Sequence, residues 1–322
     1  MADSTTYALR YRTYRRSFRR PLKTAHGVWS VREGLVLELR GEAGAIGIGE
    51  VAPLPWFGSE TLEAAIAFCH SLGGAIEGRA IEAIPKALPA CQFAFESARE
   101  MLRGLPVEEA PDLEICRLLP AGAAALAALD RDPDARTYKW KIGTAALTEE
   151  LEILMALRDR LPVGTRLRLD ANGGLDREAA RRWLDACDRF GDGATGAAEI
   201  EFLEQPLPVA EFDAACELAQ QFATPIALDE SVASLAQIEE IHRQGWRGIY
   251  VIKPAIVGSP RRLRSLCRTH GLDAVFSSVF ETEIGRDAGL RLAAALQSSD
   301  RAVGYGLDGW LSPAVWSRFG SR

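Results

Sequence analysis

The feature that most constrains the fold is a regular alternation of short apolar segments with amphipathic segments, which begins near residue 110. The apolar segments have the length and composition of buried strands. They lie at Leu113–Leu118, Thr137–Ile142, Leu167–Asp170, Ile200–Glu204, Ile226–Asp229, Gly248–Ile252, Ala274–Ser277 and Val303–Tyr305. Segments with helical periodicity lie between them, for example at Thr148–Arg160, Arg177–Phe190, Val209–Phe222 and Leu235–Gln244.

Strand–helix alternation predicts a parallel sheet, and eight strands are enough to close a (β/α) barrel of the TIM type. An open doubly wound sheet is the alternative. Such sheets usually carry a glycine-rich phosphate loop after their first strand, and this sequence has none. The fold class that we predict is therefore α/β, with a barrel in the second part of the chain.

The first 90 or so residues have a different pattern, typical of a mixed α+β unit. Strands are predicted at Tyr7–Tyr11, Leu35–Arg40 and Ala45–Glu50, and helices at Thr61–Leu72 and Pro89–Arg103. The segments 23–34 and 50–60 are rich in Gly and Pro and contain three large aromatic residues, Trp29, Trp56 and Phe57. We expect them to be long loops that form a lid or a substrate rim.

Composition excludes several classes of function. A net charge of −6 argues against a general nucleic-acid-binding protein. No apolar run approaches the roughly 18 residues of a membrane span. The six cysteines are scattered without a CxxC pair, which is typical of reduced thiols in a cytoplasmic protein. The arginine-rich start is compatible with a transit peptide or a basic RNA-binding arm, but its apolar alternation favours an edge strand.

Charged residues follow the apolar segments where strands are predicted to end. Asp170, Glu204 and Asp229 end three successive strands, and Lys253 ends the next. Each residue alone is compatible with a helix N-cap or a surface position. Together, three carboxylates at one barrel mouth predict a site for a hard cation such as Mg²⁺. A structural layer of salt bridges is the alternative.

Two lysines flank Trp140 in the segment TYKWKIG. Side chains at i and i+2 share a face of a strand, so Lys139 and Lys141 should enter the barrel mouth while Trp140 points outward. Their repulsion, with a nearby Mg²⁺, should lower the ammonium pKa and make a general base. Lys253 approaches from another side. The reaction class that this predicts is abstraction of a proton next to a carboxylate, with electrostatic stabilisation of the enolate.

The order of these residues resembles the enolase superfamily. The matching stretches are KWK at 139–141, DAN at 170–172, EQP at 204–206, DES at 229–231 and IKP at 252–254. The lysine pattern is similar to the muconate-lactonizing-enzyme subgroup and, within it, to the o-succinylbenzoate synthase family. The segments 49–62 and 277–285 resemble that family's substrate loop and seventh-strand segment. The resemblance implies a modified (β/α)7β barrel at 106–305 and an α+β capping domain at 1–105, completed by the tail at about 306–322.

The resemblance also implies roles for individual residues. Asp170, Glu204 and Asp229 would bind Mg²⁺. Lys141 would remove the α-proton and assist loss of water, Lys253 would stabilise the enolate, and Lys139 would depress the pKa of Lys141. Arg168, on the face of Asp170, would contact substrate or orient a ligand, and Ser277 and Ser278 would hold a substrate carboxylate. The implied reaction is syn-dehydration of the small-molecule carboxylate SHCHC (2-succinyl-6-hydroxy-2,4-cyclohexadiene-1-carboxylate) to o-succinylbenzoate, toward menaquinone or phylloquinone. We expect a monomer or homodimer.

Other functions share parts of this pattern. N-succinylamino-acid racemases and muconate cycloisomerases use the same platform. Dipeptide epimerases do so too, but typically add an Asp-x-Asp motif after the eighth strand, where this sequence has only Asp308. A Schiff-base aldolase that uses Lys253 and a barrel that only binds ligands are more distant alternatives.

Overall fold

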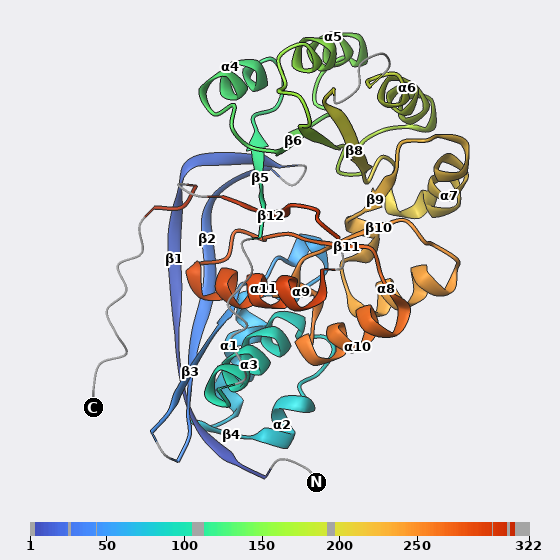
Figure 1. Cartoon of the computed structure of the whole chain (residues 1–322). Coiled ribbons are helices and arrows are strands. Elements are labelled where there is room, and N and C mark those ends of the chain that lie inside the picture. Colours follow the sequence, from blue (N-terminus) through green and yellow to red (C-terminus); the bar gives the residue numbers. More distant parts are fainter. Residues whose placement is uncertain are drawn as a thin grey trace.

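The computed structural model describes residues 4–24, 27–42, 44–104, 113–191, 197–297, 299–307 and 310–312. The first part of the chain is a four-stranded antiparallel sheet in the order β3-β2-β1-β4, with helices on one side (Figure 1). The strands are β1 (Thr6–Thr24), β2 (Gly27–Arg40), β3 (Ile46–Val51) and β4 (Ala75–Glu77), and the helices are α1 (Leu62–Ser71), α2 (Gly78–Glu82) and α3 (Pro89–Leu102). This unit is called the cap below. A Cβ atom at Gly49 would lie 2.1 Å from the Ala94 carbonyl oxygen, so β3 can pack on α3 only without a side chain there.

The prediction of a loop at 23–34 was wrong. The first strand continues to Thr24 and the second begins at Gly27, and the two pair antiparallel almost to their connection. Pairing with β1, from Leu22 opposite Trp29 to Tyr14 opposite Gly34, makes this segment part of a strand despite the glycines at either end. The arginine-rich start forms β1, which pairs with β4 at Thr6–Ala8 and is an edge only further along.

The second part of the chain is an eight-stranded parallel sheet in the order β11-β10-β9-β8-β7-β6-β5-β12. Its strands are β5 (Ile115–Leu119), β6 (Thr137–Lys141), β7 (Arg166–Asp170), β8 (Glu199–Glu204), β9 (Ile226–Leu228), β10 (Ile249–Ile252), β11 (Ala274–Phe276) and β12 (Val303–Gly306). A β-bridge from Ser277 to Gly304 joins the two outermost strands, so the sheet is nearly closed. The predicted α/β barrel with an α+β cap is confirmed.

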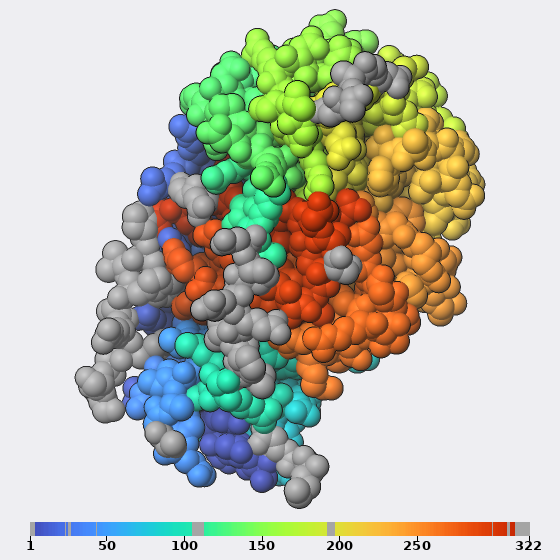
Figure 2. Space-filling model, viewed as in Figure 1, coloured from blue at the N-terminus to red at the C-terminus, as the bar shows by residue number. Residues whose placement is uncertain are grey.

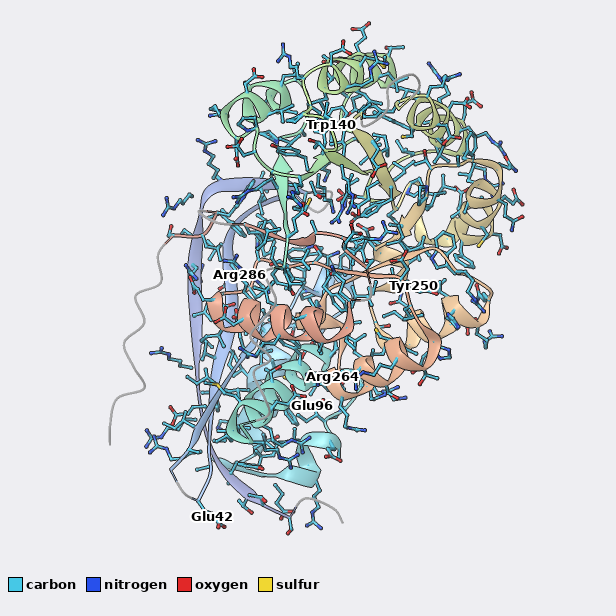
Figure 3. The ribbon with its side chains drawn as sticks, viewed as in Figure 1. Glu42, Glu96, Trp140, Tyr250, Arg264 and Arg286 are labelled. Carbon is cyan, nitrogen blue, oxygen red and sulfur yellow. The ribbon has the colours of Figure 1, made fainter. Side chains whose placement is uncertain are left out.

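Helices surround the barrel, one for each connection between its strands (Figure 1). They are α4 (Ala124–Arg131), α5 (Leu147–Arg158), α6 (Arg177–Asp188), α7 (Phe212–Gln221), α8 (Leu235–Arg243), α10 (Pro260–His270) and α11 (Glu283–Leu296), with the short α9 (Pro254–Val257) before α10. Seven strand–helix units followed by a last strand make the predicted (β/α)7β order. Trp140 points out of the barrel and packs edge-on against Trp183 of α6 (Figure 3).

The cap and the barrel share a buried boundary. The apolar core of the cap extends to Ala255 and Ile256 of α9 and to Val279. Arg264 of α10 forms two hydrogen bonds with Glu100 of α3, in the region labelled in Figure 3. On the face shown in Figure 2, the segment of α11 lies between the cap and the first strand–helix units of the barrel.

The tail contacts the cap through the residues that the structure describes there. Leu311 forms a β-bridge with Phe18, and the Ser312 amide donates to the Ser17 carbonyl. The remainder of the predicted tail lies outside the described residues, and so do residues 105–112, between the two units. The domain boundaries of 1–105, 106–305 and 306–322 therefore stay a prediction. In the described part of the chain, no helix is long and apolar enough to span a bilayer.

Candidate active site

Three carboxylates meet at the carboxyl ends of neighbouring barrel strands. Asp170 ends β7, Glu204 ends β8, and these two residues pair in register. Asp229 directly follows β9. Parallel strands present their carboxyl ends at one rim of a barrel, so the register alone brings the three side chains to the same place. All three are buried.

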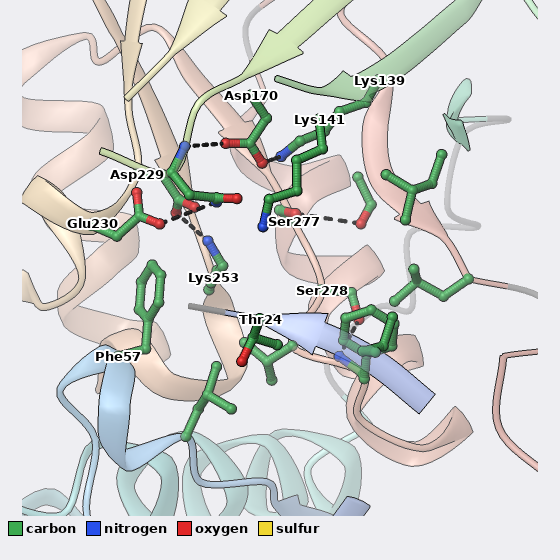
Figure 4. A pocket seen from close by; sticks show the side chains of 18 of the residues that line it. Thr24, Phe57, Lys139, Lys141, Asp170, Asp229, Glu230, Lys253, Ser277 and Ser278 are labelled. Atoms are coloured by element: carbon green, nitrogen blue, oxygen red, sulfur yellow. Dashed lines mark hydrogen bonds and ion pairs between the residues drawn. The ribbon is translucent and has the colours of Figure 1, made fainter. Parts of the chain in front are cut away.

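Lys139 bridges two of these carboxylates. Its Nζ lies 2.8 Å from Asp170 Oδ2 (Figure 4). The same atom lies 2.8 Å from Glu204 Oε1. Burial of the ammonium by itself lowers the pKa of Lys139, but the charges of Asp170 and Glu204 outweigh it and hold that pKa well above 10.5. The expectation that repulsion within the lysine pair lowers the ammonium pKa is thus wrong for Lys139, which stays a fixed positive charge.

Lys141 lies two residues further along the same face of β6 and lines the same cavity. Its strand position is in register with Asp170. Unlike Lys139, its amine forms no ion pair or hydrogen bond with any residue in the described part of the chain. Of the two lysines, Lys141 is therefore the one whose amine is available to a substrate.

Lys253 follows β10, four strand positions away from β6 in the eight-stranded sheet, so it faces the cavity from the opposite side. Its ammonium pairs with Asp229. The Nζ atom also lies 4.1 Å from the ring centroid of Phe57, a residue of the cap (Figure 4). A cation over an aromatic face is stabilised by the ring quadrupole, so cap and barrel together fix this ammonium.

The carboxylates do not titrate alike. Burial and the nearby charge of Asp170 raise the pKa of Glu204 to about 8, against the opposing charge of Lys139. Burial and Glu230 raise the pKa of Asp229 to about 6, against the opposing charge of Lys253. Burial would also raise the pKa of Asp170, but Lys139 and the Asn172 amide lower it. A further positive charge beside these groups would lower the raised pKa values of Glu204 and Asp229.

A divalent cation would supply that charge. Among the described residues, no three His, Cys, Asp or Glu side chains are gathered closely enough to enclose a metal ion as they stand. In this arrangement the ammonium groups are the partners of the carboxylates, with Lys139 between Asp170 and Glu204 and Lys253 beside Asp229. The donor chemistry still fits Mg²⁺, which prefers carboxylate oxygens and completes its shell with water and substrate. The metal ligands Asp170, Glu204 and Asp229 stay a prediction.

Six charged residues of the site form the floor of a cavity of about 350 Å³ whose roof is mostly apolar. The floor holds Lys139, Lys141, Asp170, Asp229, Glu230 and Lys253. The roof consists of cap residues, namely Leu22, Thr24, Trp29, Leu54, Trp56 and Phe57. The predicted rim aromatics Trp29, Trp56 and Phe57 therefore do lie over the strand ends. A ligand with a charged end and an apolar ring would match both surfaces.

Arg168 faces the barrel interior, as the alternation predicted, but it does not line the cavity. Its Nε donates to Glu201 Oε2 over 2.6 Å, and its guanidinium lies 4.8 Å from the centroid of the Phe202 ring. Both partners are on β8, the strand that carries Glu204. Of the two predicted roles, this placement fits that of a residue that orients a ligand strand, and not direct substrate contact.

Ser277 and Ser278 both line the cavity. The Ser277 hydroxyl donates a long hydrogen bond of 3.4 Å to the Gly304 carbonyl. The Ser278 hydroxyl donates to Glu281 over 2.7 Å and accepts from the Phe280 amide over 3.0 Å. Ser277 is therefore the less committed of the two hydroxyls. Their predicted role in holding a substrate carboxylate stays a prediction.

The chain matches two family models that meet at this site. Residues 122–308 match the model described as "Enolase C-terminal domain-like", and residues 14–102 match the model described as "MenC, N-terminal domain". An o-succinylbenzoate synthase of Thermosynechococcus vestitus is 44% identical over 307 residues, which is 94% of this chain and 93% of that protein. The chain belongs to the o-succinylbenzoate synthase family of the enolase superfamily. The prediction of an enzyme, a lyase of this family, is confirmed.

Solved structures agree with this assignment. An o-succinylbenzoate synthase from Thermosynechococcus elongatus BP-1, described as complexed with Mg in the active site, superposes with a TM-score of 0.86 at 42% identity and covers 97% of each chain. The L-Ala-D/L-Glu epimerase of Bacillus subtilis superposes with a TM-score of 0.78 at 20% identity, covering 94% of this chain and 90% of that one. The second likeness shows a shared fold.

Two residues of this synthase-family site were missed from the sequence. Gln205, in the EQP stretch, adopts a left-handed backbone with φ of 37°. Its side-chain oxygen accepts from the Asp229 and Ser231 amides, and its amide nitrogen donates to the Leu207 carbonyl. Gln205 thereby fixes the turn that carries Asp229. The signal was a polar residue directly after a strand-end carboxylate, but its partners lie on another strand.

Glu230 is the second missed residue. It lines the cavity next to Asp229 and accepts from Asn172 Nδ2 over 3.2 Å. Burial raises the pKa of Glu230, with Asp170 and Glu204 adding to the effect and Lys253 opposing it. The DES stretch contains two acidic residues, and the pattern alone gave no reason to choose both.

Proposed function

We propose that this enzyme catalyses the Mg²⁺-dependent syn-dehydration of SHCHC to o-succinylbenzoate, a step toward menaquinone or phylloquinone. The observation that carries this proposal is the division between the two lysines of β6. Lys139 is bound to the carboxylates, while the Lys141 amine faces the cavity without a partner in the described residues. The match to the family at 44% identity supports the same activity.

In the proposed reaction Lys141 removes the proton on the carbon next to the substrate carboxylate. It then returns that proton to the hydroxyl group, which leaves as water on the same face, so one residue serves both steps of a syn-elimination. The positive charge of Lys139 beside Lys141 favours the neutral amine that must act as base. Lys253 stabilises the negative charge of the enolate from the other side.

The carboxylates Asp170, Glu204 and Asp229 would hold the Mg²⁺ ion. When bound, the ion would act as a Lewis acid that neutralises charge developing on the substrate carboxylate. The carboxylates' own role is to present oxygen donors that are buried and therefore dry, which strengthens each electrostatic contact. The apolar roof of Leu22, Trp29 and Leu54 would exclude water from the ring.

A second activity, racemisation of N-succinyl amino acids, is favoured by one observation. Lys253 lies four strands from Lys141 and can reach the opposite face of a bound substrate. Two bases on opposite faces are what a racemase requires. The Asp308 position, which bears on dipeptide epimerisation, lies outside the described residues. The Schiff-base aldolase and the non-catalytic barrel gain no support from the family match.

We also propose that the protein is cytoplasmic. All six cysteines are free thiols, and all but Cys216 are buried. Whether the enzyme is a monomer or a homodimer stays a prediction.

The test is a spectrophotometric assay of the purified protein with SHCHC and Mg²⁺, run beside N-succinyl amino acids. We expect rapid dehydration that EDTA abolishes and Mg²⁺ restores. Faster racemisation than dehydration would favour the second activity, and the absence of both would contradict the proposal.

A further inference from the structure

One wall of the cavity is the segment 277–282, which connects β11 to α11. Four of its residues, Ser277, Ser278, Val279 and Phe280, line the cavity. Phe280 has a φ of 61°, a left-handed conformation that is strained for an aromatic residue. Such strain persists only where the surroundings hold the backbone in place. Barrel residues hold the start of this wall, where the Ser277 and Ser278 amides donate to the Ile252 and Gly304 carbonyls. Cap residues hold its other end, at Phe280 and Thr282.

Glu50 of β3 makes the closest of these contacts. Its carboxylate is 1% exposed and reaches across the boundary to the N-terminus of α11. It accepts from the Thr282 amide at 2.9 and 3.0 Å, from the Gly285 amide at 2.8 Å and from the Thr282 hydroxyl at 2.5 Å. Within the cap, Glu50 also accepts from the Tyr14 hydroxyl over 2.5 Å.

These bonds give Glu50 the position of a helix N-cap acceptor supplied by another domain. The first amides of a helix have no partner within the helix, and the helix dipole favours a negative charge at that end. A buried carboxylate that accepts several hydrogen bonds is costly to replace, because each abandoned donor would stay unsatisfied. The fit is close, since a Cβ atom at Gly285 would lie 2.9 Å from Glu50 Oε2.

Arg32 of β2 holds the same wall at its strained residue. Its Nε donates to the Phe280 carbonyl over 3.3 Å, and its Nη1 donates to the Pro53 carbonyl over 2.8 Å. Pro53 lies directly before the roof residues Leu54 and Phe57. Arg32 therefore connects the roof to the wall, while Glu50 fixes the end of the wall.

We propose that Glu50 is a positioning residue for substrate, which sets the place of the 277–282 wall by capping α11 from the cap domain. This inference rests on the proposed dehydration. The substrate group concerned is the part that would lie against Ser277 and Ser278. Glu50 does not line the cavity, so it acts on binding through the wall and leaves the lysines and carboxylates unchanged.

The chain contains a matched control. Glu96 of α3 is another buried cap carboxylate that caps a barrel helix, accepting from the Ser259 hydroxyl over 2.7 Å and the Arg261 amide over 3.0 Å. Neither Ser259 nor Arg261 lines the cavity. A residue that only docks the cap would behave like Glu96.

The experiment compares Glu50→Gln with Glu96→Gln in the full chain with Mg²⁺. For Glu50→Gln we expect KM for SHCHC to rise about tenfold, equivalent to about 1.4 kcal/mol of binding, with kcat changed less than about threefold. The dissociation constant of o-succinylbenzoate, measured by calorimetry, should rise by a similar factor. Glu96→Gln should lower the urea midpoint to a comparable degree and leave KM unchanged.

Two results would overturn the inference, namely equal KM for both variants or a Glu50→Gln enzyme with wild-type KM. If Glu50→Gln does not fold, Tyr14→Phe removes one hydrogen bond from the same carboxylate and should raise KM by about twofold, and an unchanged KM would again contradict the role. Failure of the proposed function is recognised separately, because the wild type would then bind o-succinylbenzoate without turning over SHCHC. In that case the ratio of the o-succinylbenzoate dissociation constants of Glu50→Gln and the wild type would test the role of Glu50.

Discussion

The floor and the roof of the cavity differ in the polarity of their side chains. The floor consists of charged side chains at the ends of barrel strands, where register places Asp170 beside Glu204 and Lys141 beside Asp170. The roof consists of aromatic and aliphatic side chains of the cap, brought over the floor by a hairpin and a short 3-10 helix at Pro55–Phe57. In the floor, Lys139 and Lys253 are held by ion pairs with the carboxylates. In the roof the contacts are rings packed edge to face, such as Trp29 on Trp56.

The difference separates two tasks. Ionic groups in a buried floor can stabilise charge that appears only in the transition state, which raises kcat. Apolar contacts of a roof bind substrate and transition state about equally, which lowers KM. Changes in the floor should therefore reduce kcat, and changes in the roof should raise KM.

The largest effect is expected from Glu204→Gln, which removes the carboxylate of β8 that pairs with the floor residue Lys139. An activating metal supplies several kcal/mol of transition-state stabilisation, so we expect about a thousandfold loss in kcat/KM together with loss of Mg²⁺ binding in calorimetry. Glu199→Gln, at the exposed start of the same strand, is the control and should change neither. An active Glu204→Gln enzyme with normal Mg²⁺ affinity would contradict the proposed role of Glu204 as a metal ligand.

Lys253 should be nearly as sensitive, but in a way that depends on charge. Lys253→Ala removes the ammonium that faces the enolate, and we expect kcat to fall about a hundredfold or more. Lys253→Arg keeps the charge and should retain appreciable dehydration. If arginine were as inactive as alanine, proton transfer by Lys253 would be the better explanation.

The stabilisation by Mg²⁺ should depend on pH. The pKa values of about 8 for Glu204 and about 6 for Asp229 exceed the ordinary 4.5 and 3.8, so the folded enzyme binds more protons than the unfolded chain within that window. Without metal, the contribution of these groups to stability is present at low pH and is lost as pH rises toward about 8. Since Mg²⁺ requires the ionised carboxylates, the rise in Tm on adding Mg²⁺ should be small near pH 5.5 and larger near pH 8.5. An equal rise at both pH values would contradict the electrostatics of the floor.

The smallest effect is expected in the roof. Trp29 packs against Phe18, Trp56 and Phe280 with ring centroids between 4.8 and 5.6 Å apart. Trp29→Leu should raise KM for SHCHC about three- to tenfold, with kcat close to that of the wild type. Steady-state kinetics measures both, and a collapse of kcat would show that the roof takes part in the chemistry.

The same contrast explains what the sequence could predict. Strand period and strand ends are local properties, so the bounds of the eight barrel strands were predicted to within two residues. The outward direction of Trp140 followed from the alternation. A layer of salt bridges with the lysines was left open as an alternative, and ion pairs do form. The specific pairing of Lys139 with Asp170 and Glu204 was not predicted, because the pattern shows that two lysines share a face but not which partners they reach.

The roof and its supports depend on contacts between distant parts of the chain. Phe57 and Lys253 are separated by nearly two hundred residues in the sequence, and no residue pattern near Phe57 predicts its contact with an ammonium group. Likewise, segment 23–34 was predicted to be a loop because its glycines are a local feature of the sequence. Its pairing within the β1–β2 hairpin is a contact between separate segments, and the local pattern does not show it. Such features become visible only when both partners are placed in space.

The most direct test of the central claim is the rate of SHCHC dehydration by Lys141→Ala at saturating Mg²⁺. The Lys141 amine is the group in the floor that we assign to proton transfer, and Lys139 next to it cannot take over while the carboxylates hold its charge. We predict loss of dehydration by about a thousandfold or more, with Mg²⁺ affinity unchanged in calorimetry. A Lys141→Ala enzyme with near-wild-type turnover would contradict the account.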